Sequence, residues 1–198
     1  MNFKGAKDYI LNRLENELTS SLSYHSVEHT LDVAEAACHF AYLENLKGDD
    51  LVFLETAALY HDSGILTQYK DHESVSVSLV RETLPLFEYS MEEIEEVSRL
   101  IMITRLPQKA VSLPEQILCD ADLDYLGRDD FFVHSFQLQL EWRNLGILET
   151  NLLDWLKIQV HFLSEHRYFT RSANSLRNEK KLFHLEQIKN LINIHSPE

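Results

Sequence analysis

The stretch ALYHDSGI at residues 58–65 decides the fold, because it ends an apolar helical stripe on two ionisable residues. The stripe leads to His61 at steps of three and four residues, through Leu51, Leu54 and Ala58. A helix face that packs on a core seldom carries ionisable groups without a bonding partner or a function, because their burial is costly. We therefore predict a helix that ends near His61-Asp62, with Gly64 as a left-handed residue behind it.

The same helical periodicity recurs along most of the chain. Apolar residues repeat at steps of three and four in five further stretches: 27–41, 94–104, 132–140, 152–163 and 185–192. The segment SVSVSLV at 74–80 alternates like a strand, but it also fits a helix, which we predict. With 5 Gly and 4 Pro, all-β architectures and long linkers are disfavoured. We predict one all-α domain over residues 1–198, with a motif-bearing core at about 24–127 and C-terminal helices at 129–194.

Composition and charge exclude several protein classes. Acidic residues outnumber basic ones by 32 to 18, and the net charge of −14 has the wrong sign for coating duplex nucleic acid. One nucleotide remains a feasible ligand, because a single local basic pocket would hold it. No apolar run approaches the ~20 residues of a membrane span, and the N-terminus lacks the apolar region of a signal peptide. Two cysteines imply no disulfide framework, so we expect a cytoplasmic protein without a membrane partner; the oligomeric state stays open, a dimer included.

Two further predicted helices place ionisable residues on apolar faces. His29 lies on the helix that opens at 24–30, and Asp122 shares the face of Leu118. One such residue is usually a core histidine or a capping aspartate. Together, two imidazoles and two carboxylates suit one divalent cation. The four residues are His29, His61, Asp62 and Asp122. The two carboxylates neutralise the ion, and a mixed N/O set leaves positions open for water, as in catalytic sites.

In this order the motifs resemble the HD superfamily of metal-dependent phosphohydrolases. Three segments carry the resemblance: YHSVEHTLDV at 24–33, ALYHDSGI at 58–65 and CDADLDYLG at 119–127. Small stand-alone bacterial members look closest, since their His-Asp pair is followed by an acidic segment, here DHESVS at 71–76. The resemblance implies an HD-type helical bundle that hydrolyses a small phosphate ester, such as a nucleotide or cyclic nucleotide. HD-type domains also serve as non-catalytic metal-binding modules for regulation or partner binding, which is the alternative function.

The resemblance also implies the metal ligands. His29, His61, Asp62 and Asp122 would bind the ion, with Asp120 as the alternative to Asp122; the Ala121-Asp122 step fits the family motif better. The ion would be Mn, Fe, Co, Ni or Mg. Two-metal members supply further histidines after the His-Asp pair, whereas only His72 follows here before His134. We therefore expect one ion, with a weak second site near His72 and Glu73.

Catalytic and substrate-binding roles follow from the same resemblance. Asp62 would hold the attacking water. His25 matches the position that protonates the leaving group in cyclic-nucleotide phosphodiesterase relatives, although a surface or capping histidine is an equal alternative.

Substrate-binding cations are less well defined by the sequence. Candidates for the substrate oxyanion are Arg105, Arg167 and Arg171, the last two in a segment, 161–181, whose local charge is +3. A solvated basic face is the alternative for that segment. His72 and Glu73 are the other two candidate substrate-binding residues. We interpret the aromatic residues Phe131, Phe132, Phe136, Trp142 and Trp155, together with Cys119, as core.

Overall fold

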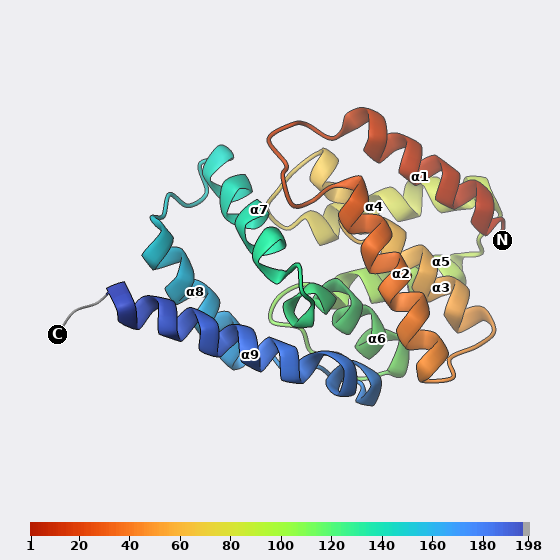
Figure 1. The fold of residues 1–198 in the computed structure, drawn as a ribbon. Helices are drawn as coiled ribbons and strands as arrows, with labels where there is room; N and C mark the ends of the chain where they lie inside the picture. Colours follow the sequence, from red (N-terminus) through yellow and green to blue (C-terminus); the bar gives the residue numbers. More distant parts are fainter. Residues whose placement is uncertain (196–198) are drawn as a thin grey trace.

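The computed structural model describes residues 1–195, and these form helices and connecting loops with no strand (Figure 1). The α-helices are α1 Phe3–Glu17, α2 Val27–Leu43, α3 Asp49–Tyr60, α4 His72–Thr83, α5 Met91–Ile103, α6 Leu113–Asp122, α7 Phe131–Asn144, α8 Leu152–Glu165 and α9 Arg171–His195. Three short 3-10 helices join them, η1 Ser63–Leu66, η2 Leu84–Phe87 and η3 Asp124–Gly127. The prediction of an all-α single domain is confirmed, and so is the helix at 74–80, which lies in α4.

None of the helices within residues 1–195 has the length and apolar character needed to span a bilayer.

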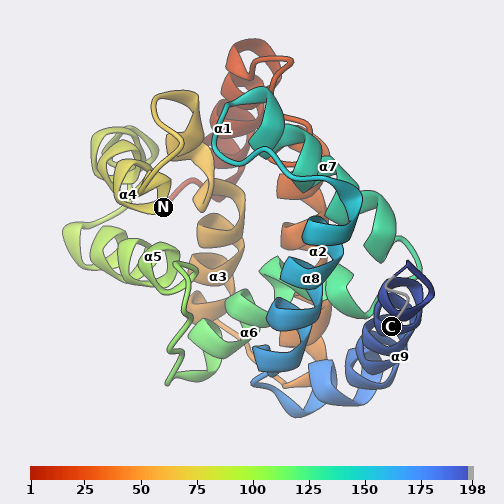
Figure 2. The same ribbon diagram turned by 90° about the vertical axis from the view of Figure 1, so that its left-hand side faces the viewer.

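The apolar side chains pack into two cores. The larger core lies among α1 to α6 and contains Phe40, Leu54 and Leu100. The smaller core is formed by η3 and the three C-terminal helices, and includes Phe131 and Ile188. Figure 2 shows α4 and α5 on the left, α3 and α6 near the middle and α9 on the right, with α7 and α8 in front of α2. The border between the two cores runs along the ends of α3 and α6, where the predicted ligands lie.

Gly64 does not adopt the predicted left-handed conformation. It lies in η1 and has no positive φ. The glycine is required for a close approach instead, because a Cβ here would lie 2.1 Å from the carbonyl oxygen of His72 and 2.6 Å from the backbone nitrogen of Ser76. Ser76 also links the two segments, since its Oγ accepts from the Gly64 N–H at 2.8 Å and donates to the His61 carbonyl at 2.7 Å. The packing of η1 on α4 therefore fixes His61 relative to His72.

We expect Gly64→Ala to destabilise the protein by about 3 kcal/mol, the upper end for overpacking, because the new methyl group meets backbone atoms. For a chain of this size the melting temperature should fall by about 6–12 °C. Gly146→Ala is the control: its Cβ would meet nothing within 4 Å, so only its left-handed φ costs energy, about 1 kcal/mol. Thermal unfolding measures both, and equal losses in the two variants would contradict the close-approach explanation.

Candidate metal centre

Three helix ends position the predicted metal ligands. His29 lies in the first turn of α2, where the Oγ of Ser26 caps the helix by accepting from the His29 N–H at 3.1 Å. His61 and Asp62 follow the last residue of α3, and Asp122 is the last residue of α6. Side chains at helix ends can meet without disturbing the apolar faces that build the larger core.

The four side chains form one cluster. The Nε2 atoms of His29 and His61 lie 3.3 and 3.0 Å from Oδ2 of Asp62. The same two atoms lie 3.7 and 3.5 Å from Oδ1 of Asp122. Neighbouring ligands of an octahedral ion with bonds of about 2.1 Å stand about 3 Å apart. The observed separations are close to that geometry.

The hydrogen bonding of the two histidines also fits a metal ion. The Nε2 atoms of His29 and His61 are buried and have no hydrogen-bond partner among the described residues. Nδ1 of His61 lies 2.7 Å from the carbonyl oxygen of Ala58. Because a carbonyl only accepts, Nδ1 carries the proton and Nε2 of the neutral ring presents its lone pair. A divalent cation would satisfy both nitrogens, so the donor set fits the group that the resemblance implies.

Protons and a metal ion compete for this cluster. Burial disfavours a charged His61, but Asp62 and Asp122 outweigh burial and raise the pKa of His61 well above its usual value. Burial likewise favours a neutral Asp62, yet the neighbouring imidazoles, His61 first, hold the pKa of this carboxyl well below its usual range. A cation held by these groups replaces the protons that the imidazoles would otherwise bind.

A second group of potential ligands shares Asp62 with the first. His25, Asp62 and His72 bring ligand atoms within 4.8 Å of one another, as do His29, His61 and Asp122. Nε2 of His72 lies 3.1 Å from Oδ1 of Asp62, and Nε2 of His25 lies 3.8 Å from its Oδ2. Glu73 is 3.9 Å from the same nitrogen of His72. The predicted weak second site thus has a set of side chains around it, and it stays a prediction.

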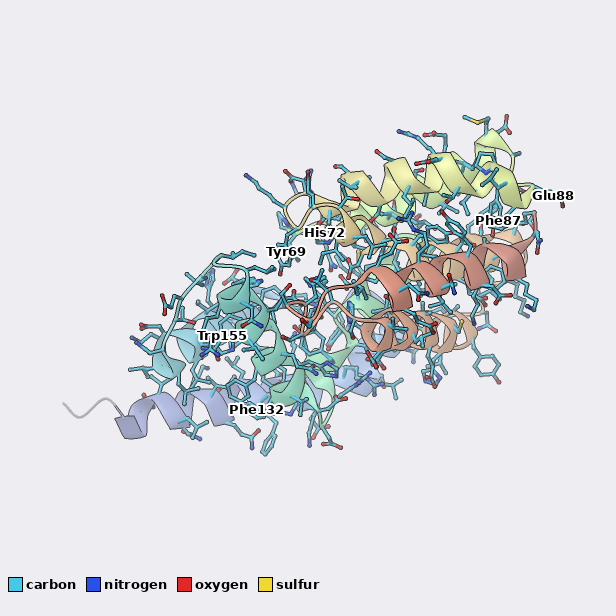
Figure 3. All side chains as sticks on the ribbon, turned by 90° about the horizontal axis from the view of Figure 1, so that it is seen from above. Tyr69, His72, Phe87, Glu88, Phe132 and Trp155 are labelled. Carbon is cyan, nitrogen blue, oxygen red and sulfur yellow. The ribbon has the colours of Figure 1, made fainter. Side chains whose placement is uncertain are left out.

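A cavity of about 660 Å³ reaches the first group through Asp122 and the second group through His25, Asp62 and His72. Its polar lining includes His25, Asp62, His72, Glu73 and Asp122, and its apolar lining includes Tyr125, Leu138, Trp142, Trp155, Ile158 and Phe162. Figure 3 shows Tyr69 and His72 at the edge of the N-terminal helices, with Trp155 among the C-terminal helices beyond them. Trp155 is buried, as predicted, but Trp142 and Trp155 also line the cavity and Phe136 is exposed, so the prediction that all five aromatic residues serve only as core is wrong.

The three predicted substrate-binding arginines lie in different places. Arg105 lines the cavity and makes an ion pair with Asp71, while its Nε lies 3.7 Å from Oε2 of Glu73. Arg167 lines a second cavity next to the first. Arg171 lines neither cavity, so we leave it out of the candidate site. The sequence positions of the three arginines did not indicate which of them would line a cavity.

The HD domain family model matches residues 26–124, which is half of the chain. The chain belongs to the HD domain family. The matched range contains all four clustered ligands and ends close to the predicted limit of the motif-bearing core. HD domains bind divalent metal ions, and membership of the family supports a metal-dependent hydrolase.

Solved structures share the HD fold with this domain. Bacillus subtilis YpgQ in complex with ADP is 23% identical, with a TM-score of 0.66, and the match covers 96% of this chain and 95% of YpgQ. A predicted HD superfamily hydrolase from an uncultured Thermotogales bacterium is 18% identical, with a TM-score of 0.63 and coverage of 98% and 92%. A Lactobacillus plantarum protein is 16% identical, with a TM-score of 0.68 and coverage of 98% and 97%. The comparison with curated proteins found no match.

The HD domain brings Asp122, and not Asp120, to the cluster. Asp120 is fully buried and accepts from the backbone N–H groups of Phe169 and Thr170 at 2.8 and 2.7 Å, and from the Thr170 hydroxyl at 2.7 Å. Burial raises the pKa of Asp120 to about 6 despite these bonds. Its carboxylate therefore holds the segment between α8 and α9 in place, so Asp120 has a structural role.

We expect Asp122→Asn to weaken metal binding strongly and to abolish hydrolysis, because it removes a charge that neutralises the ion. Asp120→Asn should keep the metal and lose about 1–3 kcal/mol of stability, the cost of leaving a buried donor unpaired. Metal analysis of the purified variants, with urea unfolding, separates the two effects. The opposite order of metal loss would mean that Asp120 is the ligand.

Sequence reasoning missed Glu141, which is fully buried in this HD domain. Its Oε2 accepts from the backbone N–H groups of Tyr24 and His25 at 2.8 and 3.0 Å. Its Oε1 accepts from the hydroxyl of Tyr69 at 2.9 Å and contacts Nδ1 of His25. Burial favours the neutral acid, but the bonds from His25 outweigh it and lower the pKa of Glu141. The charged carboxylate thus fixes the His25 ring with Nδ1 toward Glu141 and Nε2 toward Asp62.

A second contact supports this arrangement. The indole Nε1 of Trp142 donates to the hydroxyl of Tyr69 at 2.9 Å. Glu141 and Trp142 are neighbours on α7, so one turn of this helix holds both Tyr69 and the segment that leads into α2. The only local signal was an acidic residue within an apolar helix. Its partners lie 72 to 117 residues away, where no spacing rule reaches.

Proposed function

We propose that this HD domain protein is a phosphohydrolase that acts on a small phosphate ester, with nucleotides as its substrates. One observation carries the proposal: two unpaired imidazole nitrogens form one cluster with two carboxylates, and these carboxylates line a cavity that also holds a positioned histidine. A divalent cation in this site would supply a water of lowered pKa and would polarise a phosphoryl oxygen. Residues of this chain would carry out the remaining steps of the hydrolysis.

Two side chains would move or hold protons. Asp62 faces both ligand groups, so its carboxylate can accept a hydrogen bond from the attacking water and orient it. As the water oxygen bonds to phosphorus, the bond from phosphorus to the leaving oxygen breaks. His25, held through Nδ1 by Glu141, can deliver a proton from Nε2 to that oxygen. Glu141 acts through His25 and is a positioning residue.

Charged groups in the cavity would bind the phosphate. Burial opposes a charged His72, but the hydrogen bond with Asp62 outweighs it and raises the pKa of His72 to about 9. Without an ion on Asp62, the imidazolium is therefore the main form of His72 near neutral pH. Lys70 and Arg105 also line the cavity, although Asp71 pairs with the latter. These cations supply local positive charge in a protein of net charge −14.

The apolar lining favours a nucleotide over a simple phosphate ester. Trp142 is half-buried and offers a ring surface in this cavity, and Tyr125 also lines it. Stacking of one base on an aromatic ring contributes about 1–3 kcal/mol. Bacillus subtilis YpgQ, which has the same fold, was solved with ADP, and this supports a nucleotide ligand here. The cavity of about 660 Å³ is within the usual range for small-molecule sites.

The test is a hydrolysis assay in two stages. p-Nitrophenyl phosphate with added Mn²⁺, Co²⁺ or Ni²⁺ should be hydrolysed, and EDTA should stop the reaction. A nucleotide panel follows, in which each nucleoside monophosphate is compared with ribose 5-phosphate, the same ester without a base. A lower KM for the nucleotides is expected. If the protein binds metal tightly yet hydrolyses nothing, it is a regulatory or partner-binding HD module instead.

A further inference from the structure

A second cavity, of about 590 Å³, lies beside the metal cavity. Leu106, Leu123 and Phe162 line both, so these side chains form the wall between them. Gln108 lines the second cavity, and its Nε2 donates to Oδ2 of Asp122 at 3.3 Å. The second cavity thus contains none of the clustered ligands, but it contacts one of them through a side-chain amide.

His166 brings an unpaired donor to this second cavity. Nδ1 of His166 lies 3.2 Å from Nζ of Lys181, which also donates to the His166 carbonyl at 2.7 Å. Burial lowers the pKa of Lys181 to about 8, so the ammonium form still dominates at neutral pH. An ammonium only donates, so Nδ1 accepts and the proton of the neutral imidazole is on Nε2. That Nε2 is buried and lacks a hydrogen-bond partner within residues 1–195.

Positive charge surrounds this donor. Nη1 of Arg167 donates to the carbonyl oxygens of Ser164 and His166 at 2.6 and 2.8 Å, which holds the guanidinium at the cavity. Lys181 is 1% exposed and makes no ion pair in the part of the chain that the structure describes. Among the described lining residues, Glu165 is the one carboxylate. Buried positive charge without a counter-ion is costly, and an anionic ligand would offset that cost.

We propose that the second cavity binds a small molecule that carries an oxyanion, a phosphate or a carboxylate, on a planar or apolar body. The guanidinium of Arg167 and the Nε2–H of His166 would bind the oxyanion. Phe162 and Phe169 would contact the body of the ligand. Both polar groups are donors, so they select an acceptor group and disfavour a cationic ligand. The site does not depend on hydrolysis at the metal centre.

Phenylphosphonate and benzoate test the proposal. Both contain a phenyl ring and no ester to hydrolyse, but one carries a phosphonate group and the other a carboxylate. Each is titrated into the metal-loaded protein while ¹⁵N–¹H correlation spectra record Nε2 of His166. We expect a saturable shift of this nitrogen with at least one probe, and the tighter probe identifies the oxyanion. Arg167→Ala should raise the dissociation constant about 10- to 100-fold, as for loss of a charged hydrogen bond.

The matched control is Arg171→Ala, which removes the same charge from a side chain outside both cavities and should leave the dissociation constant unchanged. His61→Ala should also preserve the response of His166, because that variant disables only the metal centre. Failure of hydrolysis and failure of this site are therefore distinguishable. The proposal is overturned if neither probe shifts His166, or if Arg167→Ala and Arg171→Ala weaken binding equally.

Discussion

His61→Ala is expected to lose the divalent ion and, with it, all of the proposed phosphohydrolase activity. Nε2 of His61 lies between the carboxylates of Asp62 and Asp122, at 3.0 and 3.5 Å, and no nearby side chain replaces it. Loss of an outer-shell partner already costs about 10- to 100-fold in metal affinity, and loss of a ligand costs more. Metal analysis should find about one ion per chain in the wild type and almost none in this variant.

Metal removal should also lower the stability of the wild type. An ion at 100 times its dissociation constant stabilises the native state by about 2.7 kcal/mol. For a chain of this size, EDTA should therefore lower the melting temperature by roughly 5–10 °C. The His61→Ala protein should show no such shift, since it has no ion to lose.

His39→Ala is the matched control for these measurements. His39 lies on α2, the helix that carries His29, but its side chain is exposed. Its replacement should change neither the metal content nor the effect of EDTA. Unchanged metal content in His61→Ala would refute the assignment of the ligands, provided that the variant unfolds cooperatively.

The clustering of the four candidate ligands could be predicted from the sequence because local rules apply to each of them. His61 extends an apolar stripe, Asp122 shares a face with Leu118, and a cap places His29 in the first turn of α2. Each rule concerns a few residues along one helix. Helix ends then bring the side chains together, since the sides on which α2, α3 and α6 pack against one another are apolar.

The rest of the site depends on contacts that cross the chain. Glu141 meets His25 only because α7 packs beside the segment before α2, across 116 residues of sequence. Trp142 satisfies an apolar helical pattern and also lines the cavity, and periodicity cannot separate these two roles. The usual rule for helix ends predicted a left-handed Gly64, but the glycine is required instead by its close backbone contact with α4, which comes from tertiary packing. The role of each of these three residues depends on its neighbours in the folded structure, and the spacing of residues along the chain does not indicate those neighbours.

The border between the two cores explains why these residues gather in one cavity. Helices α2, α3 and α6 contribute the clustered ligands, whereas α7 contributes Glu141 and Trp142. Because helices from both cores contribute side chains to this site, the relative position of these helices must be fixed. The buried carboxylate of Glu141 supplies one such constraint, because it bonds Tyr69 and the backbone before α2 at once.

His25→Ala is expected to retain the metal and the melting temperature but to lower kcat by about 10²–10⁴, the range for loss of a positioned general acid. The loss should be large for alkyl phosphates and small for p-nitrophenyl phosphate, because p-nitrophenolate leaves without protonation. Steady-state kinetics on both substrates measure the difference. Equal losses would exclude the acid role, and a missing ion would make His25 a ligand of the second group with His72.

Glu141→Gln tests whether Glu141 acts through His25. The amide keeps the shape of the side chain but loses the negative charge that holds the Nδ1–H of His25. We expect a smaller fall in kcat than in His25→Ala, with the same dependence on the leaving group. The double variant should be no slower than His25→Ala alone, because groups that act as one unit do not add. Additive losses would instead show that Glu141 affects activity by a route separate from His25, such as its bonds to Tyr69 and the backbone before α2.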